Sequence, residues 1–298
     1  MKLASLAMSR RVAPYVFLLP FAAIFAAFHV YPMIYGFVVS FYNFRGLFNT
    51  TFIGFENYVT LAGDPRFHTA LLNTTKYVIG TLVTLIPIPM VLAVLLHTTF
   101  TPARRLWQVL LFLPAITSLV VVGALFRLIL MEQGGLMNYF LGWFGVPPQP
   151  WLNSTALAIP SLVLVAIWRW TGVNIVYYLA GLTTIPKELY DAAHVDGAGP
   201  FYTFFRITLP LLKPVSVFLL IISTIGGFQL FTEVWVLWPQ GSGPGDSSLT
   251  MVLYLYQRAF SSFALGYAAT LGVVLSLIIM AVSLVQFKLF GFFREVNE

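Results

Sequence analysis

The chain alternates between long apolar stretches and shorter polar connections. Six apolar stretches are long enough to cross the roughly 30 Å hydrocarbon core of a bilayer, which takes about 20 helical residues. They cover residues 14–41, 71–96, 107–130, 155–182, 215–238 and 265–290. Segments of about 10 residues with alternating polarity, which are typical of membrane β-barrels, do not occur. Because a backbone in lipid must satisfy its own hydrogen bonds, the pattern predicts an all-α integral membrane protein with six transmembrane helices.

The composition supports this prediction and narrows it. Of the 298 residues, 59% are hydrophobic and 9% are charged, whereas a soluble globular protein has about 45–50% and about 25%. A water-soluble fold is therefore excluded, and we expect residues 1–298 to form a single transmembrane domain. The chain has no cysteine, which excludes disulfides, thiolate metal sites and cysteine nucleophiles.

The basic residues are distributed unevenly between the two sides of the predicted membrane. Ten of them lie in the two tails and in the connections 98–106 and 183–214, namely Lys2, Arg10, Arg11, Arg104, Arg105, Lys187, Arg206, Lys213, Lys288 and Arg294. The other side has only Arg45, Arg66, Lys76 and Arg258. Cytoplasmic connections carry the excess of Lys and Arg, so both termini are predicted to be cytoplasmic.

Sequence motifs for energy coupling and catalysis are absent. No Gly-Lys dipeptide occurs, so a GxxxxGK[ST] phosphate loop is impossible, and there is no HExxH. A membrane enzyme would need a cluster of His, Asp or Glu within the spans. A proton-coupled transporter would need carboxylates at the midplane, and Glu233 alone comes near this position. We therefore expect no catalytic residue, cofactor or metal on this chain.

The connection 183–214 is long, polar and predicted to be cytoplasmic. Pro186 can occupy the first position of a helix, and Glu188 and Asp191 favour its positively polarised N-terminal end. Gly197 can end this helix. Small and apolar side chains along it would allow a partner to approach and bind it in a groove. An amphipathic helix can also lie on the bilayer surface, and the local pattern does not separate the two possibilities.

The same connection contains a motif with a characteristic spacing. Residues 191–197, Asp-Ala-Ala-His-Val-Asp-Gly, are followed after nine residues by Ile-Thr-Leu-Pro at 207–210. This resembles the EAA loop of ABC-importer permeases, in which EAA, three residues, Gly, nine residues and I-x-L-P follow one another. Asp191 stands where a glutamate usually leads the motif. Trp-Arg-Trp-Thr-Gly at 168–172 and Gly-Pro-Gly-Asp-Ser-Ser-Leu-Thr at 243–250 are similar to the carbohydrate-uptake branch, specifically to maltose-transporter F-type and glycerol-phosphate A-type subunits.

The resemblance implies a six-span permease of the type I importer kind in the plasma membrane of a bacterium or archaeon. It would form half of the membrane path with a homologous second permease. Its other partners would be an external solute-binding protein and two cytoplasmic ATPase subunits, which bind ATP and magnesium. The 185–210 loop would dock into a cleft of the ATPase. The residues expected to serve this coupling are Glu188, Asp191, Ala192, Ala193, Asp196 and Gly197.

Polar and aromatic residues in the fourth and fifth spans are the candidates for the substrate path, because polar groups inside a membrane usually face a cavity or another helix. Gly226 and Gly227 lower helix propensity and permit a kink or a close approach. Sugar recognition requires aromatic faces and fixed hydrogen-bonding groups, and this region has both. The residues expected to line the path are Asn174, Tyr177, Phe228, Gln229, Thr232 and Glu233. For each of them, packing between helices is the alternative.

The function expected from these features is that of a permease subunit of an ATP-driven importer. The lipid bilayer and a sugar or oligosaccharide substrate are its expected contacts, and nucleic acid is not. The alternative cargo is glycerol phosphate or another small polar solute. Arg169 lies between two tryptophans in the fourth span and can pair with a carboxylate of another subunit, reach toward the membrane surface or hold a phosphate.

Overall fold

The structure is a computed structural model that describes residues 12–45, 49–97, 103–239 and 241–290. Its contacts divide the chain into two compact units. Unit 1 comprises Met1–Asp64 and Leu255–Val274, and unit 2 comprises Pro65–Tyr254 and Leu275–Glu298. The single domain over 1–298 stays a prediction. Four of the basic residues used to predict the orientation lie outside the described residues, namely Lys2, Arg10, Arg11 and Arg294.

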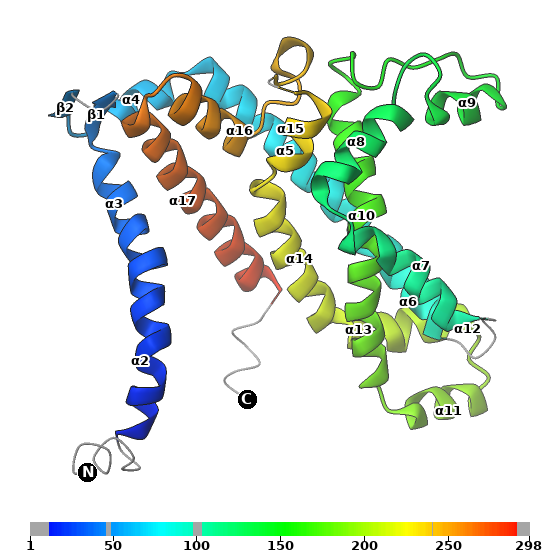
Figure 1. The fold of residues 1–298 in the computed structure, drawn as a ribbon. Coiled ribbons are helices and arrows are strands. Elements are labelled where there is room, and N and C mark those ends of the chain that lie inside the picture. The colour runs from blue at the N-terminus through cyan, green and yellow to red at the C-terminus, as the bar shows by residue number, and fades with distance from the viewer. Residues whose placement is uncertain (1–11, 46–48, 98–102, 240, 291–298) are drawn as a thin grey trace. The chain divides into compact units, whose positions relative to one another are not determined.

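Unit 1 is built from a long apolar helix and a short hairpin (Figure 1). Its elements are α2 (Ala13–Phe25), a π-helical turn (Ala26–Val30), α3 (Tyr31–Val39), β1 (Tyr42–Arg45), β2 (Asn49–Phe52), α4 (Glu56–Ala62), a second π-helical turn (Gln257–Ser261) and the first part of α17 (Leu265–Leu289). α2, the π-helical turn and α3 continue as one helix from Ala13 to Val39, which confirms the first predicted span. The strands pair antiparallel, with Tyr42 opposite Phe52, and the sequence analysis did not predict this hairpin.

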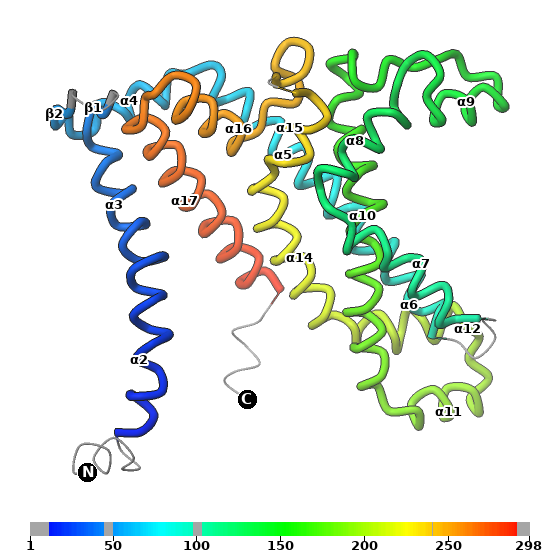
Figure 2. Tube along the Cα trace, in the orientation of Figure 1, coloured from blue at the N-terminus to red at the C-terminus, as the bar shows by residue number. Residues whose placement is uncertain are grey.

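Unit 2 contains the remaining spans and their connections. Its elements are α5 (Pro65–Leu85), α6 (Pro87–His97), α7 (Arg104–Ile116), α8 (Leu119–Ile129), α9 (Leu136–Gly142), α10 (Ala158–Thr183), α11 (Lys187–Val195), α12 (Pro200–Thr203), a π-helical turn (Phe204–Thr208), α13 (Leu209–Leu211), α14 (Lys213–Phe228), α15 (Thr232–Leu237), a 3-10 turn (Pro244–Asp246), most of α16 (Met251–Tyr256) and the end of α17. Figure 2 traces this path from cyan at α5 to yellow at α14. Within unit 2, α9 and α15 lie at one end, and α11 and α12 lie at the opposite end.

The central helix of unit 2 is α10, which packs against α5, α6, α7 and α14. Near the α11 end, Ile175, Tyr178 and Leu182 of α10 form a buried cluster with residues of α6 and with Leu212 and Leu219. These positions on α10 follow one another at intervals of three and four residues, which places them on one face of the helix. The cluster therefore fixes the position of the helices from which α11 extends.

Two of the six predicted spans are broken. The third, 107–130, consists of α7 and α8, which are bent by 100° relative to each other. Thr117 is extended (φ −74°, ψ 139°) at the break, and Pro114, which lacks an N–H group, lies in the last turn of α7. The fifth, 215–238, ends as a helix at Phe228, and α15 begins only at Thr232. The break in the third span was not predicted, whereas the end of α14 at Phe228 directly follows Gly226 and Gly227, where the sequence permits a kink.

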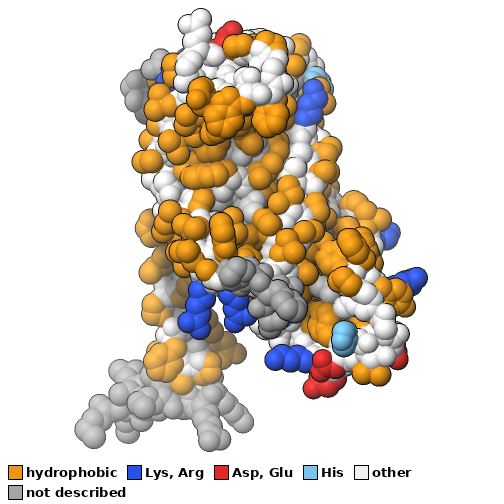
Figure 3. All heavy atoms as spheres, turned by 90° about the vertical axis from the view of Figure 1, so that its right-hand side faces the viewer, with side chains coloured by type: hydrophobic (Ala, Val, Ile, Leu, Met, Phe, Trp, Pro, Cys, Tyr) orange, Lys and Arg blue, Asp and Glu red, His pale blue; other side chains and the backbone are white. Residues whose placement is uncertain are grey.

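The other predicted spans are confirmed as long apolar helices. The second begins at Pro65, six residues before its predicted start, and is interrupted between Leu85 and Pro87. The fourth and sixth are α10 and α17. Hydrophobic side chains cover most of the face shown in Figure 3, and most charged side chains on that face gather toward its lower part. A surface of this kind is stable against lipid rather than water.

The close approach of α10 to α7 leads to a first prediction. A Cβ atom added to Gly172 would overlap the carbonyl oxygen of Leu111 and lie 2.8 Å from Phe112 Cα, so the backbone itself would have to move. Gly226, also in a helix, has nothing within 4 Å of an added Cβ. We expect Gly172→Ala to destabilise the protein by about 1–3 kcal/mol, and Gly226→Ala to have no such effect. Thermal unfolding in detergent measures the difference, and equal midpoints would contradict the packing described.

Candidate functional site

The connection between α10 and α14 forms the helix that the sequence predicts. α11 begins at Lys187 and is preceded by Pro186, which has an extended ψ of 132° and caps the helix from outside. The prediction that Pro186 occupies the first helical position was therefore wrong by one residue. The reason is that Pro186 itself has an extended ψ of 132°, so helical backbone angles begin only at Lys187.

Gly197 ends α11 as predicted, because the chain there requires a left-handed residue. Its φ is +76°, a region that residues with a Cβ rarely adopt. The N–H group of Ala198 donates to the carbonyl of Ala193 at 2.8 Å, and that of Gly197 donates to His194 at 3.0 Å. This pair of hydrogen bonds is the Schellman arrangement, which satisfies the last carbonyls of a helix.

The residues expected to couple to a partner all lie on α11 or on its C-terminal cap. Glu188 is in the first turn, Asp191 and Ala192 are exposed in the middle, Ala193 is half-buried, and Asp196 and Gly197 form the cap. The apolar side chains of Leu189 and Val195 are 43% and 87% exposed, respectively. An isolated helix of nine residues would be marginal in water. Contacts with the rest of unit 2 must therefore hold it in place.

Tyr190 supplies such a contact, and the sequence analysis did not identify it. Its ring packs against the buried cluster of α6, α10 and α14. Its hydroxyl group lies 3.1 Å from that of Thr208, which is buried. Tyr190 therefore holds one side of α11 against the membrane helices and leaves the acidic and apolar side free. The aromatic residue among charged neighbours was the only sequence signal for this role.

Four of the six residues expected on the substrate path gather at the break in the fifth span. Phe228 is the last residue of α14 and is buried, whereas Gln229 follows it and is exposed. Thr232 and Glu233 begin α15 and are half-buried. The hydroxyl group of Thr250 donates to the carbonyl of Leu230 at 2.9 Å, which satisfies an acceptor inside the break.

The two remaining path candidates lie on α10 and do not join this group. The amide nitrogen of Asn174 donates to the carbonyl of Leu85 at 2.9 Å. That carbonyl is four residues before Pro89, which has no N–H group to offer it. Asn174 therefore supplies the missing donor at the break between α5 and α6. Tyr177 contacts Phe218, with ring centroids 5.4 Å apart. Phe218 lies ten residues before Phe228, which corresponds to about 15 Å along a helix.

Arg169 donates to backbone carbonyls at a third helix break, the one between α7 and α8. It is 8% exposed, so it does not reach toward the membrane surface, and its Nη1 donates to the carbonyls of Thr117 at 2.6 Å and Pro114 at 3.4 Å. Its guanidinium carbon lies 5.2 Å from the centre of the Trp170 ring. Arg169 therefore satisfies backbone acceptors where α7 and α8 bend away from each other. The sequence could not show this, because Arg169 and Thr117 are 52 residues apart.

A large hollow opens at the α9 end of unit 2, between the α8 and α15 helices and the loops beside them. Its volume is about 1370 Å³, and its lining includes Arg127 of α8, Met131 just after α8, Trp235 of α15, Trp238, and Ser242 and Gly243 of the following loop. The indole N–H of Trp238 donates to the carbonyl of Leu152 at 2.7 Å, which fixes the ring. We refer to this feature as the α8–α15 hollow.

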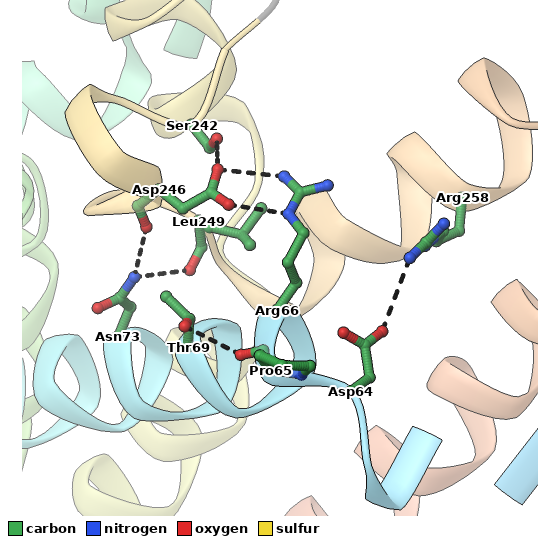
Figure 4. Close-up of polar contacts among 9 residues, drawn as sticks. All are labelled: Asp64, Pro65, Arg66, Thr69, Asn73, Ser242, Asp246, Leu249 and Arg258. Atoms are coloured by element: carbon green, nitrogen blue, oxygen red, sulfur yellow. Dashed lines mark hydrogen bonds and ion pairs between the residues drawn. The ribbon is translucent and has the colours of Figure 1, made fainter. Parts of the chain in front are cut away.

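The loop of residues 241–250, which borders this hollow, is tied to α5 by polar contacts (Figure 4). The guanidinium of Arg66 donates to both carboxylate oxygens of Asp246, at 2.8 and 3.1 Å, and Ser242 donates to the same carboxylate. The amide nitrogen of Asn73 donates to the carbonyls of Asp246 and Leu249. We call Arg66, Asn73, Ser242 and Asp246 the latch. None of them was predicted, because the two segments are more than 170 residues apart.

The latch is partly exposed to solvent, which sets its electrostatic strength. The hydrogen bonds from Arg66 lower the pKa of Asp246 below its ordinary value of 3.8, although burial acts in the opposite direction. Asp246 therefore stays ionised at neutral pH, and its contribution to stability is lost only when the pH falls below about 4. The side chains of Arg66 and Asp246 are 42% and 30% exposed. An ion pair of this kind contributes roughly 0.2–1 kcal/mol.

The chain matches a known protein family and individual relatives over most of its length. The family described as "Binding-protein-dependent transport system inner membrane component" matches residues 86–290 of the chain. The chain is 45% identical to the arabinooligosaccharides transport system permease protein AraP of Bacillus subtilis, over 96% of this chain and 91% of that protein. It is 35% identical to the lactose transport system permease protein LacF of Rhizobium radiobacter, over 92% of each chain.

Solved structures resemble the fold described above. A crystal structure of a bacterial ABC transporter involved in the import of the acidic polysaccharide alginate contains a chain that is 25% identical, with a TM-score of 0.82 over 100% of both chains. The same alginate transporter in complex with its alginate pentasaccharide-bound periplasmic protein matches with 26% identity and a TM-score of 0.82, over 93% of each chain. Among the described residues, no three His, Asp or Glu side chains come together to hold a metal ion.

The position of Arg169 leads to a second prediction. Arg169→Met would leave the partly buried carbonyl of Thr117 without its donor, which costs about 1–3 kcal/mol. We expect a lower thermal midpoint for Arg169→Met in detergent, and an intermediate one for Arg169→Lys, which keeps one donor but loses the planar shape. Arg127→Met is the matched control, since Arg127 is exposed on α8, and should change stability by no more than about 0.5 kcal/mol. A midpoint for Arg169→Met equal to that of the control would show that the bend does not depend on Arg169.

Proposed function

Because this chain belongs to the family of binding-protein-dependent transport system inner membrane components, we propose that it forms one half of the path through a carbohydrate importer and is moved by ATPase subunits that dock on α11. The chain is a permease subunit of the sugar ABC transporters and not an enzyme. The second permease, the two ATPases with their ATP and magnesium, and the external solute-binding protein are the proposed partners.

The observation that carries this proposal is the construction of α11. It is a short helix with exposed acidic and apolar side chains, and it is held on its other side by Tyr190. An element that projects beyond the membrane helices while being fixed to them can transmit a movement, because a shift of its partner moves the helices that anchor it. The coupling residues proposed are Glu188, Asp191, Ala192, Ala193, Asp196 and Gly197.

The orientation of the chain is part of the proposal. Lys187, Arg206 and Lys213 belong to the elements at the α11 end of unit 2, and basic residues are more frequent on the cytoplasmic side of membrane proteins. We therefore assign the α11 end, with both termini, to the cytoplasm. The 241–250 loop and the α8–α15 hollow then face the outside of the plasma membrane.

The substrate path is proposed to run past the break between α14 and α15. A helix break in a membrane exposes backbone groups and side chains to a cavity, and such breaks are a common place for binding in transporters. Gln229, Thr232 and Glu233 are not fully buried there, and Phe228 adds an aromatic ring. Asn174 and Tyr177 are proposed to line a deeper section of the same path, although Asn174 also satisfies Leu85.

A sugar or oligosaccharide is the proposed cargo. Relatives with high identity are named for arabino-oligosaccharides and lactose, whereas a relative named for sn-glycerol-3-phosphate is 31% identical over 81% of this chain. Arg169, the charged residue that would suit a phosphate, donates to the backbone of the chain itself. Both observations favour a sugar over glycerol phosphate.

Coupling through α11 can be tested with two glycine variants that differ in backbone conformation. Gly197 has a φ of +76°, whereas Gly199 has a φ of −74° and nothing within 4 Å of an added Cβ. Gly197→Ala should loosen the end of α11 at a cost of about 1 kcal/mol, and Gly197→Val should do so more strongly. We expect both variants to lower the ATP hydrolysis that sugar-loaded binding protein stimulates in proteoliposomes of the assembled transporter. Gly199→Ala should retain the parental rate.

Asp191→Lys reverses a charge on the exposed side of α11 and tests the same contact without changing the cap. It should abolish the stimulated hydrolysis while the chain still inserts and assembles with the second permease. Parental stimulation in Asp191→Lys and in both Gly197 variants would remove the docking role of α11.

The proposed path can be tested at Gln229, because it is exposed and its removal leaves no cavity in the core. We expect Gln229→Ala to reduce uptake of radiolabelled sugar several-fold, since a lost hydrogen bond to the cargo costs about 0.5–1.5 kcal/mol. Arabinotriose and lactose are the first sugars to screen. Gly226→Ala, at the same end of α14, is the matched control and should transport normally. Equal uptake by both variants would place the cargo elsewhere.

A further inference from the structure

The sequence of the 241–250 loop does not by itself favour one fixed conformation. It contains Gly241, Gly243 and Gly245, and residues without a Cβ lose the most conformational freedom when they are ordered. Gly243, Gly245 and Asp246 all have positive φ values, between 58° and 72°. Such a loop requires specific contacts to keep one conformation, because its sequence alone allows many.

The latch supplies these contacts from a single helix. Arg66 and Asn73 lie two turns apart on the same helix, α5. Arg66 holds the side chain of Asp246, and Asn73 holds the carbonyl groups of Asp246 and Leu249. The loop then ends at Met251, whose N–H group donates to the hydroxyl of Thr74, also on α5. Contacts with α5 therefore fix both the side chain of Asp246 and the backbone of the loop.

The held loop forms part of the border of the α8–α15 hollow. Ser242, Gly243 and Pro244 line the hollow and lie two to four residues before Asp246. The lining also includes residues of α8 and Trp238. Because the glycines leave the loop without large side chains, the shape of this border is set by the backbone, and the backbone is set by the latch.

We propose that Arg66, Asn73 and Asp246 are positioning residues that hold the 241–250 loop in the shape on which the external solute-binding protein docks. This rests on the proposed function, in which the hollow faces the outside. A preformed loop does not have to be ordered when the partner binds, so the latch increases the affinity for the partner without touching it. The partner is a folded protein rather than lipid, because a wide hollow with polar and aromatic lining offers complementary contacts to a protein surface.

The small contribution of the Arg66–Asp246 pair to global stability distinguishes this positioning role from a role in folding. The pair between Arg66 and Asp246 is partly exposed, and such pairs contribute little to global stability. Its loss should therefore affect the local order of the loop and leave the assembled transporter intact. A second ion pair provides a comparison, since Arg258 lies 3.7 Å from Asp64 within unit 1 and neither residue lines the hollow.

The experiment uses the complete transporter in nanodiscs, with ATP hydrolysis measured while its sugar-loaded solute-binding protein is titrated. The variants are Arg66→Met, Asp246→Asn and the double variant; asparagine is chosen because it tolerates the positive φ of Asp246. Asp64→Asn is the matched control. Hydrogen exchange of residues 241–250 is measured on the same samples.

We expect each single variant to raise the half-maximal concentration of binding protein about five-fold, with a maximal rate within about two-fold of the parent. The double variant should equal the single variants, because the two residues act through each other. Hydrogen exchange in the loop should become faster in all three, and Asp64→Asn should behave like the parent.

Three results would overturn the proposal. Unchanged exchange in the loop would show that the latch does not hold it. Faster exchange with an unchanged half-maximal concentration would show that the binding protein does not dock there. An equal effect of Asp64→Asn would indicate a general structural defect. If the parental transporter is not stimulated by binding protein at all, the proposed function fails instead of the latch.

Discussion

The structure of unit 2 depends on one constraint: a backbone carbonyl inside a membrane must find a donor within the protein, because lipid offers none. Three breaks interrupt its long helices, and a side chain from elsewhere in the chain serves each of them. Asn174 donates to Leu85 between α5 and α6, Arg169 donates to Thr117 between α7 and α8, and Thr250 donates to Leu230 between α14 and α15. Without these donors each break would leave a buried or partly buried acceptor unpaired, at a cost of about 1–3 kcal/mol.

This constraint also changes the meaning of polar residues in the spans. An intramembrane arginine or asparagine is a natural candidate for contact with cargo, and in this chain Arg169 and Asn174 also donate to backbone carbonyls. Gln229, Thr232 and Glu233 remain accessible at a break. A transporter that changes conformation needs such breaks as hinges, and the donors that satisfy them hold each hinge in a defined geometry. Polar residues that satisfy the backbone therefore lie in the fourth span, and polar residues that stay accessible lie at the break in the fifth.

At each end of unit 2, side-chain contacts hold a short segment in place. At one end, Tyr190 fixes α11 to the buried cluster and leaves the acidic side of the helix exposed. At the other, the latch fixes a glycine-rich loop to α5. In both cases contacts with the rest of unit 2 hold a short segment that has little stability of its own and keep it in one shape.

The number and approximate bounds of the spans, the short helix of the 183–214 connection and its end at Gly197 were determined by the sequence alone, because hydropathy and glycine conformation act locally. The family resemblance was likewise contained in the local motif at 191–210. Only the tertiary structure decided where the third and fifth spans break, what Arg169 and Asn174 bind, and that Arg66 meets Asp246. These outcomes depend on partners 20 to 180 residues apart. No pattern within one segment specifies which distant carbonyl or carboxylate a polar side chain reaches, since packing of the intervening helices sets that distance.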